Sequence, residues 1–209
     1  MKTWQLWYYS CYASFIIDKH SSIINFLLCH GQKQATRFQF NNIKKHNCMN
    51  ALILFIIAAL TLSPFNVSSP SFKQNGMIPS DYTCEGRNIN PAITIKNIPP
   101  KTMSLALIVD DPDAPKGTFD HWIIWNIDPS VTTINENSAP GTEGKNGSGK
   151  NGYMGPCPPS GTHHYHFKVY ALNAKLSLAA GATKKQLETA MKTHILAKAE
   201  LIGLYKKIK

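Results

Sequence analysis

The chain has 209 residues, 43% of them hydrophobic and 16% charged, and its formal net charge is +10. This apolar content is enough to build a core and excludes a chain that is disordered throughout. The positive charge is almost all lysine, since Arg37 and Arg87 are the only arginines. No basic run alternates with aromatic residues as single-strand nucleic-acid binders require. We therefore expect solvated surface lysines and no nucleic-acid partner.

The first part of the chain gives no fold signal. Residues 1–48 show no sustained helical or strand period, and we expect a spurious or disordered extension there. Met49 then opens an apolar run of about a dozen residues, which suits the core of a signal peptide and is too short to span a membrane. Residues 49–69 are interpreted as a signal-peptide-like segment, with a buried core helix as the alternative. A start at Met49 predicts export to the periplasm or secretion; otherwise the protein is membrane-anchored or cytoplasmic.

Residues 70–209 alternate short apolar runs with Pro, Gly and Asn, which is typical of a mainly β domain. Strands are predicted at residues 92–95, 104–109, 121–127 and 165–172, and a helix from a capping box at Thr183 to about Thr193. The run 104–109 is apolar on both faces, which predicts a central strand. Residues 141–152 are rich in Gly, Asn and Lys and predict a mobile loop, whereas the tail 199–205 fits a strand or a helix.

A phosphate-loop match at residues 144–150, GKNGSGK, does not predict a nucleotide site. Asn151 stands where a magnesium-binding Ser or Thr is needed, and the proline-rich segment after it cannot begin a helix. A metal site is not expected either, although His163, His164 and His166 are common ligand types. Side chains alternate along a strand, so His164 and His166 point to one face and His163 points to the other.

Two other segments bring acids, imidazoles and a phenol to the ends of predicted strands. Asp111, Asp113 and His121 lie at the ends of two strands, and His163 and Tyr165 share a face at the start of a third. If those ends meet, the imidazoles and the phenol can donate hydrogen bonds to a phosphate-like anion, while the acids orient the histidines. The alternative is that the two acids only cap a turn around the prolines. A serine hydrolase is not favoured, because no serine lies in a Gly-x-Ser-x-Gly motif.

Several motifs, in order along the chain, closely resemble one known family. They are YTCEG at 82–86, DDPDAP at 110–115, His121 with Trp122, GPCPPSGTH at 155–163 with Tyr165, Gly181 to Thr183, and HILA at 194–197. Together they resemble the phosphatidylethanolamine-binding protein family, and among its members the bacterial Raf kinase inhibitor-like branch. The resemblance runs from about Ser71 to the C-terminus. It implies an antiparallel β-sandwich with short helices near the C-terminus.

The resemblance also implies a function and a set of ligand-binding residues. The set is Asp111, Asp113, Pro115, His121, Gly161, His163 and Tyr165. We expect a non-enzymatic protein, without cofactor, that binds a small anion such as phosphate or a phospholipid headgroup and modulates a partner protein such as a kinase or protease. The sequence leaves open whether the protein forms a homodimer. The alternative is a hydrolase that uses His121 or His163 as general base, with Asp111 as its orienter.

Further expectations concern single positions. The resemblance implies a cis peptide bond between Ala114 and Pro115. The family usually has Arg where this chain has His164. This difference puts in question the rigidity of the loop that carries Asp111 and Asp113, here called the acidic loop. Asp110 and Asp120 are interpreted as ordinary turn and surface residues. Cys84 and Cys157 are either bridged, as an oxidising compartment would favour, or two independent thiols.

Overall fold

The structure is a computed structural model of the whole chain, and it describes residues 63–208. These residues belong to one compact unit. The expectations for residues 1–48, and for the apolar run up to residue 62, fall outside the described residues. Within residues 63–208, no helix is long and apolar enough to cross a membrane.

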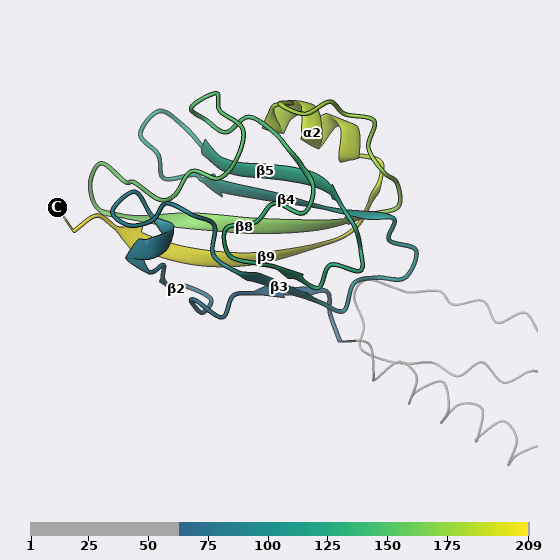
Figure 1. Cartoon of the computed structure of the whole chain (residues 1–209), viewed down its shortest axis with the longest axis horizontal. Coiled ribbons are helices and arrows are strands. Elements are labelled where there is room, and N and C mark those ends of the chain that lie inside the picture. Colours follow the sequence, from purple (N-terminus) through teal and green to yellow (C-terminus); the bar gives the residue numbers. More distant parts are fainter. Residues whose placement is uncertain (1–62, 209) are drawn as a thin grey trace, which may run out of the picture. The chain divides into compact units, whose positions relative to one another are not determined.

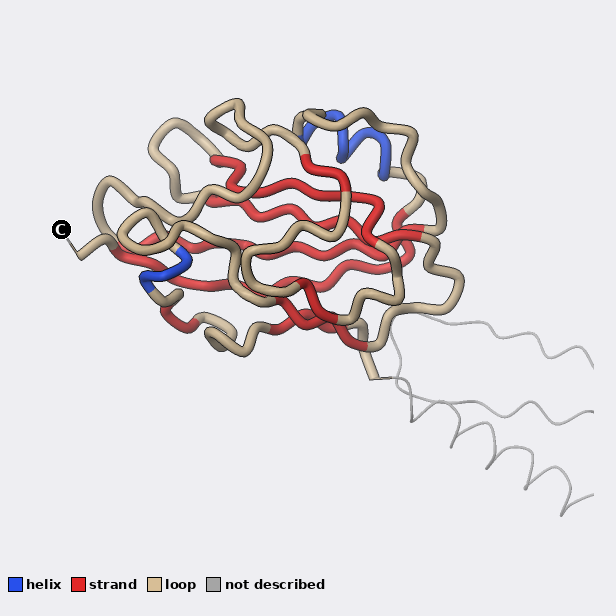
Figure 2. The backbone as a smooth tube through the Cα atoms, viewed as in Figure 1, coloured by secondary structure: helices blue, strands red, loops and turns tan. Residues whose placement is uncertain are grey.

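The described residues form a two-sheet structure with little helix (Figures 1 and 2). The strands are β1 (Asn66–Ser68), β2 (Gly76–Met77), β3 (Ile93–Lys96), β4 (Ser104–Asp111), β5 (Phe119–Ile127), β6 (Thr133–Ile134), β7 (Thr142–Glu143), β8 (Thr162–Leu172) and β9 (Ile195–Lys206). A 3-10 helix, η1 (Ser80–Tyr82), and the α-helix α2 (Lys184–Met191) complete the elements. The predicted antiparallel β-sandwich is confirmed.

The larger sheet has six strands in the order β2-β9-β8-β4-β5-β7, and the smaller has the order β1-β3-β6. The β4, β5, β8 and β9 pairings are antiparallel, and β2 joins β9 in parallel. Every residue of β4 is buried, as its two apolar faces predict for a central strand. The ambiguous tail is part of β9, because its alternating Leu201, Gly203 and Tyr205 are buried against β8.

The main core fills the space between the two sheets. Ile93 and Ile95 of β3 meet Tyr165, Phe167 and Val169 of β8 there, and all five are at most 1% exposed. The alternation predicted for β8 is therefore confirmed. Each fully buried aliphatic side chain of this kind stabilises the fold by about 1.5–3 kcal/mol.

The opposite face of the large sheet is covered at one end by α2 (Figure 1). Leu187 and Met191 of the helix are buried against Ile123 and Trp125 of β5. The predicted capping box is present: the Thr183 side chain accepts from the Gln186 backbone N–H, and the Gln186 side chain accepts from the Thr183 backbone N–H. Two terminal N–H groups are thereby satisfied.

Two segments differ from their predictions. Residues 66–68, at the end of the segment interpreted as signal-like, form β1 and pair with β3. Part of the Gly-rich stretch 141–152 forms β7, and a bridge joins Lys145 to Asn151. The buried Asn146 holds the intervening turn, because its Oδ1 accepts from the backbone and hydroxyl of Ser148. Composition alone did not indicate this hydrogen-bonded order.

Candidate functional site

Four of the seven predicted site residues, Asp111, His121, His163 and Tyr165, come together at one end of the large sheet, where β4 ends and β5 and β8 begin. Asp111 is the last residue of β4, and His163 and Tyr165 lie near the start of β8. The antiparallel pairing of β4 with β8 brings these positions to the same edge. His163 is also opposite Tyr205 of β9 in the register, so four strand ends surround the site.

A β-bulge turns His121 toward this site. Val109 pairs with Trp122 and Asp110 pairs with Asp120, so β5 has one extra residue, His121, between the two pairs. A bulge of this kind lets neighbouring side chains leave the strict alternation of a strand. Trp122 lies in the core between the sheets, and His121 packs edge-on against Tyr165, which belongs to the same core, at a ring distance of 5.1 Å.

Asp111 holds His163 in a fixed orientation. The Nδ1–H of His163 donates to Oδ2 of Asp111 at 2.7 Å, and the backbone N–H of Asp113 donates to Oδ1 at 2.8 Å. Both side chains are buried, with 8% of His163 and 5% of Asp111 exposed. Because Nδ1 is used, Nε2 of His163 is the ring nitrogen left for a ligand.

His121 is fixed in a different way. Its Nδ1–H donates to the backbone carbonyl of Met154 at 2.6 Å, and the Met154 N–H donates to the His121 carbonyl at 2.9 Å. Burial lowers the pKa of His121 below its ordinary value, because the charged imidazolium is poorly solvated there. At neutral pH the ring is therefore neutral, and its Nε2 carries a lone pair.

Tyr165 places an unsatisfied hydroxyl beside the two imidazoles. Its side chain is fully buried, and within residues 63–208 the hydroxyl has no hydrogen-bond partner of good geometry, although the Cys157 backbone lies close by. Burial, followed by the nearby Asp111 carboxylate, strongly raises the pKa of this phenol. The group thus stays protonated, and a buried donor without a partner costs about 1–3 kcal/mol. A buried, unsatisfied donor beside two imidazoles marks a candidate ligand position.

Asp113 does not join this buried cluster. Its Oδ2 accepts from the backbone N–H of His164 at 2.8 Å and from the ring Nδ1–H of His164 at 2.7 Å. These hydrogen bonds lower the pKa of Asp113. The pair is half-exposed and lies outside the buried cluster. His164 therefore contacts the acidic loop from the position where the family usually has Arg, by two hydrogen bonds.

Pro115 and Gly161 lie in the loops that flank the cluster, and both are exposed. Gly161 has a φ of 71°, a conformation that favours glycine. The expected cis bond at Ala114–Pro115 is wrong, since residues 63–208 contain no cis peptide bond.

The interpretation of Asp110 as an ordinary turn or surface residue is also wrong. Asp110 is 1% exposed, and its carboxylate accepts from Lys168 at 2.7 Å and from Lys184 at 2.5 Å. Burial by itself would raise the pKa of Asp110, but the hydrogen bonds from the two lysines outweigh it and lower the pKa. Lys184 also reaches Asp120 at 3.3 Å. These contacts tie the first turn of α2 to β4, on the sheet face opposite Tyr165.

Cys84 and Cys157 are joined by a disulfide with a Cα–Cα distance of 5.4 Å. The bridge ties the segment after η1 to the proline-rich loop before β8. The Cys84 N–H also donates to the Pro156 carbonyl at 3.1 Å. Because the Cys157 backbone lies next to the Tyr165 hydroxyl, the bridge helps to fix one wall of the site.

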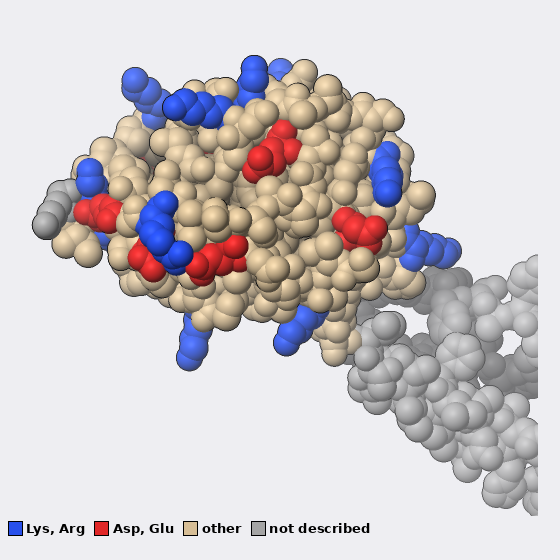
Figure 3. All heavy atoms as spheres, in the orientation of Figure 1, with Lys and Arg blue, Asp and Glu red and all other residues tan. Residues whose placement is uncertain are grey.

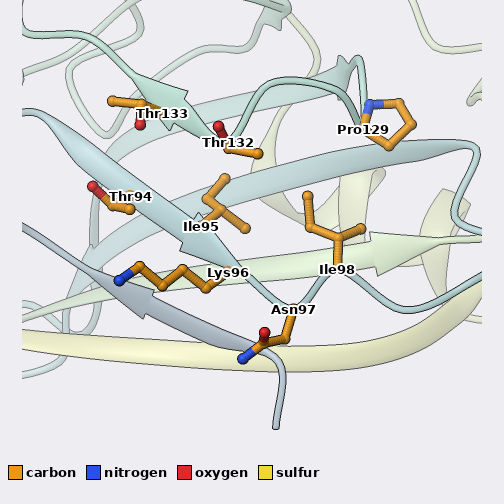
Figure 4. A pocket seen from close by; sticks show the side chains of 8 residues that line it. All are labelled: Thr94, Ile95, Lys96, Asn97, Ile98, Pro129, Thr132 and Thr133. Atoms are coloured by element: carbon orange, nitrogen blue, oxygen red, sulfur yellow. The ribbon is translucent and has the colours of Figure 1, made fainter. Parts of the chain in front are cut away.

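Two cavities are lined by residues other than these. One, of about 510 Å³, is an open depression on the small sheet, where Ile95 and Ile98 are flanked by Pro129 and Thr132 (Figure 4). Its polar lining consists of threonines and Asn97, and Lys96 is its one titratable residue. The other, of about 210 Å³, is lined by Trp122, Tyr153, Glu143 and carboxamide side chains.

Charge and metal-binding groups do not indicate a different site. Figure 3 shows Lys and Arg side chains dispersed over the displayed face, with Asp and Glu among them, rather than gathered in one basic patch. In the part of the chain that the structure describes, no three His, Cys, Asp or Glu side chains are placed to hold a metal ion.

The sequence profile of phosphatidylethanolamine-binding proteins matches residues 68–206. The chain belongs to the phosphatidylethanolamine-binding protein family. The UPF0098 protein of Pyrococcus horikoshii is 50% identical over 150 residues, which cover 66% of this chain and 75% of that protein. The UPF0098 protein of Methanothermobacter thermautotrophicus is 46% identical over 149 residues, which cover 68% of this chain and 99% of the relative.

Solved structures of the phosphatidylethanolamine-binding protein family have the same fold. The putative phosphatidylethanolamine-binding protein homologue of Chlamydia trachomatis is 40% identical, with a TM-score of 0.67 over 68% of this chain and 97% of that chain. Escherichia coli YbcL, described as a member of the mammalian family, is 29% identical, with a TM-score of 0.65 over 69% of this chain and 99% of that chain. These comparisons identify a binding protein of this fold.

Sequence reasoning missed three groups of the site in this family member. They are the Met154 carbonyl, the Phe119 ring, which packs against His121 at 4.9 Å, and Tyr205, which lies opposite His163. Phe119 and Tyr205 are aromatic residues near strand ends, and this position could have added them to the predicted site residues. Nothing in the sequence marks a backbone carbonyl as the partner of a particular histidine.

Proposed function

We propose that this protein is a non-catalytic binding protein whose pocket, formed by His121, His163 and Tyr165, takes a small phosphate-bearing group. The observation that carries the proposal is the buried Tyr165 hydroxyl, which has no good partner in residues 63–208. It stands beside two imidazoles that are each tied at Nδ1. A phosphate oxygen would accept from the phenol and satisfy it. Asp113, Pro115 and Gly161 are proposed as the rim.

Protonation decides which phosphate the pocket prefers. When both imidazoles are neutral, their Nε2 atoms are acceptors, and Tyr165 is the one donor of the three. A phosphate monoester retains an O–H in part at neutral pH, because its second pKa is about 6. It can therefore donate to a neutral imidazole, whereas a phosphodiester or sulfate cannot. The proposal favours a monoester at neutral pH and expects diesters to bind only as the histidines become protonated.

Calorimetric titration of the full chain with inorganic phosphate, phosphoethanolamine and sulfate tests this proposal. Phosphate and phosphoethanolamine should bind more tightly than sulfate at pH 7.5, and the difference should narrow at pH 5.5. His163→Ala should weaken phosphate binding by about 1.5–3 kcal/mol, the range for a hydrogen bond to a charged group. His164→Ala is the matched control, because its ring bonds to Asp113 on the opposite face. Equal losses in the two variants would refute this pocket.

A hydrolase is the second candidate, and one observation favours it. The 2.7 Å bond from His163 to Asp111 has the geometry of a general base with its orienter. The alternative lacks an identified protein nucleophile, because Cys157 is bridged and, within residues 63–208, the His163 side chain is hydrogen-bonded to Asp111 and to no serine. Turnover of a phosphoester that disappears in His163→Ala would support the hydrolase and contradict the non-catalytic proposal.

We also propose that the protein is exported and that it modulates a partner protein. The support for a partner is indirect: the rim residue Asp113 and its neighbour His164 are about half-exposed, so they are accessible to another protein. Pull-down from the native host with wild type and the double variant Asp113→Ala, His164→Ala would test it. A partner captured equally by both would place the contact elsewhere.

A further inference from the structure

We propose that the 210 Å³ cavity beside β5 and β7 is a second binding site, for a small organic ammonium ion. Five segments of the chain line it. Trp122 comes from β5, Glu143 from β7, and Tyr153 from the loop that follows, while Asn88 to Asn90 and Asn137 to Ala139 close the remaining sides. The volume is below the 300–1,000 Å³ or so of pockets for drug-sized ligands. A small ion or headgroup is therefore the appropriate size class.

The carboxylate of Glu143 supplies the charge that selects a cation. The Trp122 indole N–H donates to Oε1 of Glu143 at 3.1 Å, which fixes the carboxylate in the cavity wall. Within residues 63–208, Oε2 has no hydrogen-bond partner, and Glu143 forms no ion pair with a Lys, Arg or His. A partly buried carboxylate without a counter-ion favours a positive ligand.

An aromatic ring in the same wall also favours a cation: Tyr153 is partly exposed there, whereas Trp122, at 1% exposed, supports it from the core. Trp122 and Tyr153 pack edge to face, with ring centroids 5.7 Å apart and an interplanar angle of 86°. The Tyr153 hydroxyl donates to the Tyr82 carbonyl at 2.8 Å, so the ring is held in place. Aromatic rings attract ammonium groups through their quadrupole, and methylated ammonium ions combine this charge with an apolar surface.

The cavity walls are fixed by the protein itself. Asn90 is 4% exposed, and its Nδ2–H donates to the Asn135 carbonyl, while its Oδ1 accepts from the Ser138 N–H. The Asn88 Oδ1 accepts from the Gly155 N–H at 2.7 Å. The carboxamide oxygens of Asn88 and Asn90 therefore hold the loops, and Glu143 Oε2 remains as a charged acceptor for a ligand. This inference goes beyond the proposed anion pocket and uses none of its side chains.

The test is a titration of the full chain with choline, monitored through the NMR signal of the Trp122 indole N–H. Choline should shift this signal, because the N–H bonds to the carboxylate that would meet the cation. The neutral isostere 3,3-dimethylbutan-1-ol has the same shape without charge. It should bind about tenfold more weakly, which corresponds to about 1.4 kcal/mol. This comparison needs no variant.

Two variants locate the site. Glu143→Gln keeps an oxygen for the Trp122 N–H but removes the charge, so choline affinity should fall about tenfold. Glu188→Gln, on the exposed face of α2, is the charge-matched control and should leave the affinity unchanged. His163→Ala should also leave it unchanged, which separates this site from the anion pocket. Equal binding of choline and its isostere, or a choline affinity that depends on His163 and not on Glu143, would overturn the inference.

Discussion

Asp111 and His163 form a buried carboxylate–imidazole pair at 2.7 Å, beside the half-exposed pair of Asp113 with His164, also at 2.7 Å. The two pairs join the same two segments of the chain, and both have the same chemistry. They differ in burial, because adjacent residues of β8 face opposite sides of the sheet. The chain thus contains its own comparison of a buried and an exposed carboxylate–imidazole pair.

Asp111→Ala should destabilise the fold far more than Asp113→Ala. Removing Asp111 leaves the buried His163 N–H and the Asp113 N–H without their acceptor, which we expect to cost about 3 kcal/mol. The exposed pair should contribute at most about 1 kcal/mol. Urea unfolding of the two variants measures the difference. Similar midpoints for both would show that burial of the first pair has no energetic consequence.

His121 should make the protein less stable as the pH falls below about 6.5, the ordinary histidine pKa. Burial lowers the pKa of His121 in the folded state. Between the lowered and the ordinary value, the unfolded chain therefore binds more protons than the folded chain, so protons favour unfolding. The contribution of neutral His121 to stability is present above about pH 6.5. It is lost as the pH falls toward the pKa of His121 in the folded state.

Thermal unfolding of wild type and His121→Asn at pH 7.5 and 5.5 checks this prediction. An asparagine amide N–H can still donate to the Met154 carbonyl but does not titrate. The variant should lose less stability than wild type between the two pH values. Saturating phosphate should reduce the loss in wild type, because an anion stabilises the imidazolium. A loss of the same size in the variant would assign the pH dependence to other groups.

The face of each side chain in β8 could be predicted from the sequence, and the position of His121 could not. Alternation along one strand is a local property, so it correctly separated His163 and Tyr165 from His164. The direction of His121 depends on a bulge, which arises from the pairing of β5 with β4. Which strand of such a pair has the extra residue is decided by tertiary packing and is not visible in either strand alone.

The burial of Asp110 was missed for a similar reason. Its counter-ions, Lys168 and Lys184, are 58 and 74 residues away along the chain. Local sequence shows an acid before a proline-rich turn, which usually indicates a turn residue. Its burial depends on the packing of both β8 and α2 against β4.

Asp110→Ala should therefore cost about 3 kcal/mol of folding free energy, since it leaves two lysines without their buried partner. The cost is at the lower end for such a change because Lys168 and Lys184 are 21% and 18% exposed and can turn toward water. Asp120→Ala is the control: it loses one contact of 3.3 Å at a partly exposed site and should cost at most about 1 kcal/mol. Chemical denaturation that ranked Asp120 above Asp110 would contradict the arrangement at α2.

Reduction of the Cys84–Cys157 bridge should lower the stability by about 4 kcal/mol. The bridge closes a loop over a sequence separation of 73 residues, and the entropy that it removes from the unfolded chain grows slowly with loop length. Both cysteines are exposed, so a mild thiol reductant should reach the bridge in the folded protein. Thermal unfolding with and without reductant measures the change, and the double variant Cys84→Ala, Cys157→Ala should match the reduced wild type and no longer respond to reductant.

We expect the site to stay assembled below the new midpoint, because the Cys84 N–H still donates to Pro156 and the Gly155 N–H still donates to Asn88. Phosphate affinity of the reduced protein should then change by less than about threefold, roughly 0.6 kcal/mol. A collapse of phosphate binding at temperatures where the reduced protein remains folded would show that the bridge, and not these hydrogen bonds, holds the wall beside Tyr165.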